Sequence, residues 1–157
     1  TLKIDGKEYS NKFEVLKDPN TTGTLSDIND QFQFLFTLRN TINETVDLIN
    51  KIENIRFDLQ KNERSSRSKK LERELYRIES NLFDTKLTGA REDAFRNPNK
   101  IYGRLAALGS DLTRFGSDFK PTDQQVKVYN VLSSRLIEQK KDFDKVMKNE
   151  FWYSEKK

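Results

Sequence analysis

The sequence predicts a mainly α-helical protein, an antiparallel up-down four-helix bundle with one long first helix, preceded by a short N-terminal β-hairpin. Three observations predict this fold. Residues 25–59 contain one apolar stripe, with a hydrophobic residue every seven positions from Ile28 to Ile49 and no proline or glycine. Three later segments repeat apolar residues three and four positions apart. Asp5-Gly6 separates two short segments of alternating polarity, as in hairpins.

Residues 1–19 are expected to form the hairpin. Leu2 and Ile4 precede the turn, and Tyr9, Phe13 and Val15 follow it with the spacing of a second strand. A two-stranded hairpin is marginally stable in water, so it is expected to pack either on the helices or on a sheet whose other strands lie outside this sequence. The second option is favoured, which makes residues 1–19 the remnant of a preceding β-sandwich.

The bundle is expected to span residues 24–153 and to begin after the breaker cluster that runs from Asp18-Pro19 to Gly23. The first helix is predicted over about 25–62, with Thr24 or Ser26 as its N-cap and Asp27 in its first turn. Such a helix would be about 55 Å long, whereas the third would be under about 30 Å. We therefore expect the first helix either to overhang the others or to bend near Asn40–Asn43.

The second and third helices are predicted over about 67–87 and 98–116. The second has apolar residues at positions 71, 75, 78 and 82, and we expect it to end near Leu87-Thr88-Gly89 with glycine in the left-handed conformation. Asn97-Pro98 has the composition of an N-cap followed by the first helical position. The third helix then carries apolar residues from Ile101 to Phe115.

The fourth helix is predicted over about 122–150. Thr122-Asp123-Gln124-Gln125 matches a capping box, in which the threonine and the last glutamine satisfy each other's backbone amides. Phe151, Trp152 and Tyr153 follow this helix. These three aromatic residues either close the core or form an exposed anchor for a partner.

Composition excludes much familiar chemistry. The 157 residues include no cysteine and no histidine, so disulfides, Cys/His zinc sites, thiolate nucleophiles and Ser-His-Asp triads cannot form within them. Carboxylates are numerous, but their spacing is that of a charged helix surface. We therefore expect no enzyme activity, no metal and no cofactor, and no segment is apolar enough to cross a membrane.

Two clusters are candidate interaction residues. Phe32, Phe34 and Phe36 flank the main stripe of the first helix. Burial of that helix from two directions is the favoured explanation, and an interface with a preceding domain, a protein partner or a second copy is the alternative. Arg64, Arg67, Lys69 and Lys70 form the densest basic patch, interpreted mainly as a solvated turn and otherwise as a phosphate or acidic-partner site.

The order of motifs resembles one known family. Asp5-Gly6, Asp18-Pro19, Gln31-Phe32, Lys86-Leu87-Thr88-Gly89 and the capping box that begins at Thr122 are together similar to the C-terminal region of large bacterial sortilin-like proteins with BNR-type repeats, often labelled glycosyl hydrolases. The resemblance implies a preceding β-propeller and a small β-sandwich whose last hairpin is residues 1–17. It also implies export to the periplasm or cell surface. Asn20 departs from the arginine usual in this family, and no catalytic residue transfers to this chain.

Three functions follow in order of preference. The first is a non-catalytic accessory or interaction domain of a larger secreted β-propeller protein, with the preceding β domain of the same chain as its partner. The second is a stand-alone helical module for protein interaction or homo-oligomerisation. The third is a weak nucleic-acid binder, because the net charge is +4 and the pI is about 9.2. Nucleic acid is the least favoured partner, since the basic patch has no interleaved aromatic residue.

Overall fold

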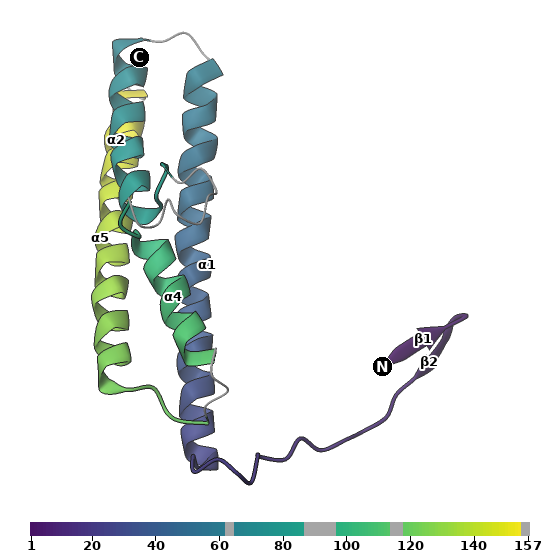
Figure 1. The fold of residues 1–157 in the computed structure, drawn as a ribbon. Helices are drawn as coiled ribbons and strands as arrows, with labels where there is room; N and C mark the ends of the chain where they lie inside the picture. The colour runs from purple at the N-terminus through teal and green to yellow at the C-terminus, as the bar shows by residue number, and fades with distance from the viewer. Residues whose placement is uncertain (62–64, 87–96, 114–117, 155–157) are drawn as a thin grey trace.

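The computed structural model describes residues 1–61, 65–86, 97–113 and 118–154, without the side chains of 150–154. Within these residues a two-stranded hairpin precedes four helices that form an elongated bundle (Figure 1). The predicted class, a mainly helical bundle with a long first helix and an N-terminal hairpin, is confirmed. The elements are β1 (Leu2–Ile4), β2 (Lys7–Tyr9), α1 (Leu25–Lys61), α2 (Ser66–Leu82), α4 (Ile101–Thr113) and α5 (Asp123–Ser154).

The unequal helix lengths are accommodated by α2 and α4, which lie one after the other along α1 (Figure 1). With 17 and 13 residues, they are about 25 and 20 Å long, whereas the 37-residue α1 is about 55 Å long. α1 is one continuous helix. Its first turns extend beyond α4, and there the Gln31 Nε2 atom donates to the Phe119 carbonyl oxygen at 3.0 Å. The expected overhang is therefore limited to these turns.

The direction of the helices alternates from α1 to α2 but not from α2 to α4. Both α2 and α4 run opposite to α1, whereas α5 runs parallel to it (Figure 1). Hydrogen bonds agree with these directions. Gln60, near the end of α1, donates to the Glu72 side chain in the first half of α2. Gln31, near the start of α1, approaches the carbonyl oxygen of Leu112 at the end of α4 at 3.5 Å. α2 ends part-way along α1, so α4 continues in the same direction over the remaining length. The expected up-down-up-down order is corrected to up-down-down-up.

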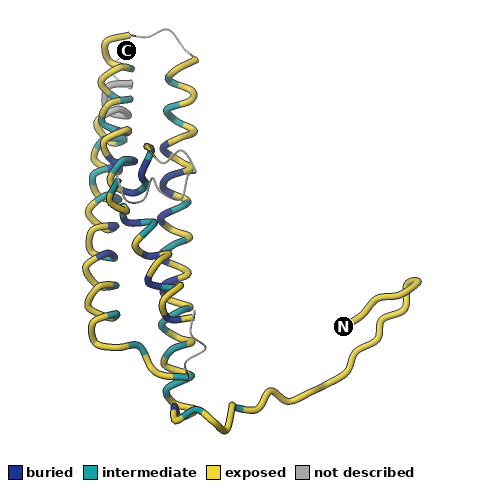
Figure 2. The backbone as a smooth tube through the Cα atoms, in the orientation of Figure 1, coloured by how far each residue is buried: buried dark blue, intermediate teal, exposed yellow. Residues whose placement is uncertain are grey.

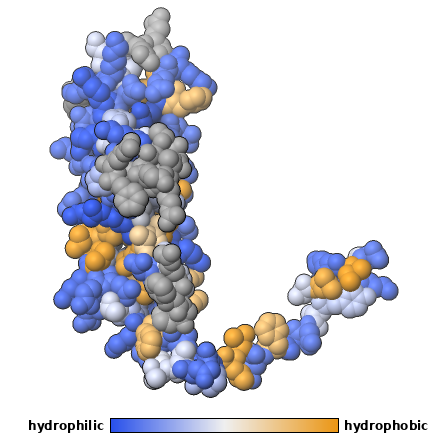
Figure 3. Space-filling model, in the orientation of Figure 1, coloured by the Kyte–Doolittle hydropathy of each residue, from blue (hydrophilic) through white to orange (hydrophobic). Residues whose placement is uncertain are grey.

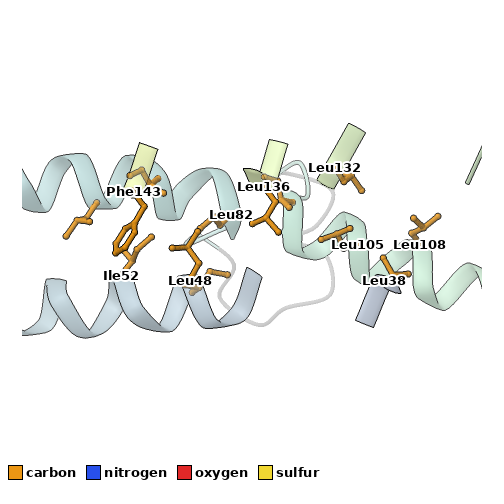
Figure 4. Packing of buried hydrophobic residues seen from close by; sticks show 13 residues of the cluster. Leu38, Leu48, Ile52, Leu82, Leu105, Leu108, Leu132, Leu136 and Phe143 are labelled. Carbon is orange, nitrogen blue, oxygen red and sulfur yellow. The ribbon is translucent and has the colours of Figure 1, made fainter. Parts of the chain in front are cut away.

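One continuous core joins the four helices. Its side chains point into the same interior from all four, as Figure 4 shows, and buried positions line the facing sides of the helices in Figure 2. Leu38 meets α4 closely, since a Cβ added at Gly109 would lie 3.3 Å from its Cδ2 atom. The buried members are Leu38, Leu48, Ile49, Ile52, Leu75, Ile78, Leu82, Ile101, Leu105, Leu108, Leu132, Leu136 and Phe143.

Thr24, rather than Ser26, caps α1. The Asp27 amide donates to Thr24 Oγ1 at 3.1 Å, and Asp27 Oδ2 accepts from the Thr24 hydroxyl at 2.6 Å and the Thr24 amide at 2.9 Å. These bonds, with a smaller contribution from Lys120, hold the pKa of Asp27 below its ordinary value of 3.8. The stabilisation is thus complete above pH 3.8 and is lost as the pH falls through the lowered pKa.

Two other local predictions are confirmed. The Thr122 amide donates to Gln125 Oε1 at 2.9 Å, and the Gln125 amide donates to Thr122 Oγ1 at 3.2 Å, so the capping box starts α5. Asp5 and Gly6 adopt φ angles of 47° and 77°, as a type I′ turn requires. The second strand was predicted too long, because β2 ends at Tyr9 and Phe13 and Val15 lie beyond it.

The boundaries of α2 differ from the prediction. α2 begins at Ser66, where the Ser65 hydroxyl caps it by accepting from the Ser68 amide at 3.0 Å. It ends at Leu82 because Phe83 is extended, with φ −135° and ψ 147°, and its ring packs edge-on against Tyr102 at 5.9 Å. The predicted glycine C-cap at residues 87–89 lies outside the described residues.

α4 begins three residues later than predicted. Asn97-Pro98 precedes the helix, and the first helical hydrogen bond runs from the Arg104 amide to the Lys100 carbonyl oxygen at 3.0 Å. Ile101, the first helical residue, is already part of the core. The helix therefore starts where the chain reaches the other helices, and the N-cap signal at Asn97 is not used.

Leu105→Ala tests whether α4 is an essential part of the core. The Leu105 side chain is fully buried among the helices, so its truncation should lower the free energy of unfolding by about 2–5 kcal/mol in urea denaturation. Ile137→Ala is the matched control, because Ile137 is exposed on α5 and should change the value by less than about 1 kcal/mol. Equal effects of the two variants would contradict this packing.

Candidate interaction surfaces

The described ranges hold no group of three or more Asp, Glu, His or Cys side chains placed to bind a metal ion. None of the helices in those ranges has the length and apolar character needed to cross a bilayer. The remaining candidates are surfaces: an N-terminal arm, an aromatic face, a basic segment and a groove.

The N-terminal arm, residues 1–17, projects away from the bundle (Figure 1). Within the described part of the chain its hairpin contacts no helix. Its apolar side chains are nevertheless numerous and exposed, with Phe13 at 85% and Val15 at 83%, and apolar surface is spread along it in Figure 3. The hairpin was expected to pack either on the helices or on a sheet outside this sequence. Packing on the described helices is not observed. The other exposed apolar side chains of the arm are Leu2, Ile4, Tyr9 and Leu16.

The end of the arm is fixed to the bundle by a network of hydrogen bonds. Lys17 Nζ donates to the Thr21 carbonyl oxygen at 2.6 Å and to Thr21 Oγ1 at 2.9 Å. The Thr21 hydroxyl in turn donates to the Asp118 carboxylate, which lies 97 residues away in the sequence. Asn20, the position that departs from the resembled family, donates from its amide and from Nδ2 to Asp18 Oδ1 at 2.8 and 3.0 Å. This network is the anchor of the arm.

Gly23 allows the backbone to approach the segment before α5. It is buried, and an added Cβ would lie only 2.0 Å from the Asp118 carbonyl oxygen. Any side chain at this position would force the two backbones apart. The base of the arm is thus held at a defined place on the bundle, while residues 1–16 extend from it.

The three phenylalanines named as candidate interaction residues lie in two different environments. Phe34 packs edge-on against Tyr129, with ring centroids 5.4 Å apart, and borders the core. Phe32 and Phe36 are 58% and 43% exposed and lie 6.1 Å apart, and Arg39 stacks over the Phe36 ring at 4.0 Å. Burial from two directions therefore describes Phe34 but not Phe32 or Phe36.

The basic patch is located partly on a helix. Arg67, Lys69 and Lys70 are exposed in the first turns of α2, where the predicted start of the second helix near residue 67 puts them, so the interpretation as a solvated turn is wrong for these three. Arg64 lies outside the described residues. Positive charges are not favoured by the dipole at a helix N-terminus. Phe151, Trp152 and Tyr153 are helical in α5, but their side chains lie outside the described residues.

One surface was missed by sequence reasoning. Val128 and Val131 lie beside the core stripe of α5 and line a groove of about 620 Å³ between α4 and α5. The sequence contains a signal for this groove, because Val128 and Val131 are three residues apart and lie next to Leu132. Apolar spacing alone does not show whether such valines are buried in the core or exposed beside it. Arg104 and Arg135 lie at the same groove.

Comparison of the chain with known protein families, with curated proteins and with solved structures found no match.

Gly23→Ala tests the close approach at the base of the arm. The new Cβ overlaps the Asp118 carbonyl oxygen, so we expect the free energy of unfolding to fall by about 1–3 kcal/mol in urea denaturation. Gly6→Ala is the control, because the hairpin contacts no described helix, so the strain of alanine at its φ of 77° stays in the arm and should leave the unfolding of the bundle unchanged. A Gly23→Ala protein as stable as the parent would contradict the anchor geometry.

Proposed function

We propose that this chain is a non-catalytic helical accessory domain that joins a β-rich domain of a larger secreted protein through its N-terminal arm. The observation that carries the proposal is the arm itself. Phe13 and Val15 are more than four-fifths exposed, although the bundle beside them has a complete core. Apolar side chains at this density on an extended segment favour a partner surface.

The chemistry of the arm favours a β-sheet as that partner. A two-stranded hairpin has an unpaired edge on each side, and its backbone groups can add to another sheet. The strands are only three residues long, so the hairpin gains little stability from its own pairing. Docking on a sheet would satisfy the backbone edge and bury the apolar side chains together.

The anchor suits a joint between two domains. Lys17, Thr21 and Asp118 hold the base of the arm on the bundle, so a sheet that receives residues 1–16 would be held near one end of the helices. The bundle buries its own core without the arm. Association would therefore connect two separately folded units.

The resemblance to bacterial sortilin-like proteins with BNR-type repeats agrees with this proposal. In that family the hairpin would be the last one of a β-sandwich, and a β-propeller would precede the sandwich. The protein would then be exported to the periplasm or cell surface. Any chemistry would belong to the preceding domains, and the helical part would contribute stability or hold a partner.

Amide hydrogen exchange tests the docking of the arm. We expect amides of residues 2–16 to exchange rapidly in the 1–157 protein and at least about 100-fold more slowly in the natural gene product that contains the β domain, because a sheet would pair them. The control is a protein lacking residues 1–16, whose melting temperature should stay within about 2 °C of the 1–157 protein. Unprotected arm amides in the natural product, or a natural product with no β domain, would refute the proposal.

Self-association is a second candidate function, favoured by the exposed aromatic pair Phe32 and Phe36. If this pair forms a homodimer interface, the double variant Phe32→Ser and Phe36→Ser should convert the dimer to a monomer in sedimentation velocity. Phe57→Ser is a matched control, because Phe57 is also exposed on α1 and also lies under a cation, Lys61, at 3.9 Å. A monomeric parent protein at high concentration would exclude this function.

A further inference from the structure

The groove between α4 and α5 has an apolar floor. Its volume is about 620 Å³, and no residue of α1 or α2 lines it. Val128 and Val131 are 48% and 51% exposed, and Leu108 and Leu132 continue the floor into the core. Ala107 adds a short side chain from α4, so the groove can admit the side chains of a partner. Figure 3 shows apolar surface on this part of the bundle, bordered by hydrophilic surface.

The charged residues around this floor are mainly basic. Arg104, Lys127 and Arg135 line the groove together with one acidic residue, Asp111. Within the described residues, none of the three cations forms an ion pair with a carboxylate, and the Arg104 Nε atom donates to the Asn99 carbonyl oxygen at 2.8 Å. The positive charge beside the groove is therefore available to an anionic partner.

We propose that this groove binds an amphipathic helix of a partner protein, with apolar residues on one face and acidic residues beside them. The apolar face would cover Val128 and Val131, and the acidic residues would pair with Arg104, Lys127 and Arg135. This is helix-in-groove recognition, in which residues at i, i+3 or i+4 and i+7 contact the floor. α4 is about 20 Å long, so a helix of three to four turns would match it.

A helix fits this groove better than an extended segment does. Both walls are helices, whose backbone groups are already hydrogen-bonded, so they cannot pair with a strand. A helix satisfies its own backbone and needs only side-chain contacts. The N-terminal arm of this chain is therefore a poor occupant, because it is extended and carries both signs of charge at Lys12, Glu14 and Lys17.

A second copy of the chain is also disfavoured by charge. The chain has a net charge of +4, so a second copy brings no excess of negative charge to the three cations of the groove. An acidic helix gains from the same charge, which should speed its association at low salt. This inference does not depend on the proposed function, because none of the groove residues belongs to the arm or its anchor.

Peptide binding to the 1–157 protein tests the groove. The probe is a fluorescent 15-residue helical peptide with leucines at i, i+3 and i+7 and flanking glutamates, and the comparison peptide carries lysine in place of every glutamate. We expect the acidic peptide to bind more tightly by anisotropy, and Val131→Glu to weaken it at least about tenfold. Ile137→Glu is the matched control, since Ile137 is 48% exposed on the same helix outside the groove, and should leave the affinity within about twofold.

Charge reversal provides a second readout. The double variant Arg104→Glu and Arg135→Glu should abolish the preference for the acidic peptide or reverse it, and raising the salt concentration should narrow the preference in the parent protein. Equal binding of the acidic and basic peptides, or no effect of Val131→Glu, would overturn the proposal. A concentration-dependent dimer that Val131→Glu dissociates would also overturn it, because a second copy would then occupy the groove.

Discussion

The rest of the structure depends on the burial of one long apolar stripe. α1 has 37 residues, and its buried and partly buried apolar side chains extend from Phe34 to Leu59, so partners are needed along most of its length. Neither α2 nor α4 is long enough to cover the apolar stripe of α1 alone. Together they cover the stripe as one long helix would. α5 then packs mainly on these two shorter helices and less on α1. The direction of α4 follows, since it continues along α1 from the place where α2 stops.

Polar contacts between the helices fix how they align along this core. Glu79 is buried on α2 and pairs with Arg56, whose guanidinium lies 4.9 Å from the Tyr76 ring. A buried ion pair adds little net stability, but its geometry disfavours other alignments of α1 and α2. Thr41 has the corresponding role opposite α5, where its hydroxyl lies 2.9 Å from the Tyr129 hydroxyl. Both contacts lie beside leucine-rich packing. Leucine side chains alone would also allow the helices to pack when shifted along one another.

The same arrangement explains which surfaces remain for partners. Because α1, α2, α4 and α5 complete the core, the arm is not needed to cover it, and Phe13 and Val15 stay exposed. At any height along the bundle, only one of the two short helices, α2 or α4, packs with α1 and α5 (Figure 1). No further described helix therefore covers the outer side of α4 and α5, and the groove beside Val131 stays open there. The arm suits a sheet and the groove suits a helix, so the two surfaces would serve different partners.

The sequence by itself determined the features that depend on neighbouring residues. The bonds between Thr24 and Asp27, the capping box at Thr122 and the turn at Asp5-Gly6 are all local, so residue type and spacing predict them. Only the tertiary structure decided that α2 ends at Leu82, that α4 runs parallel to α2, and that Phe34 is packed whereas Phe32 is exposed. These depend on which surface each helix meets, because apolar spacing predicts a buried face but not the partner that buries it.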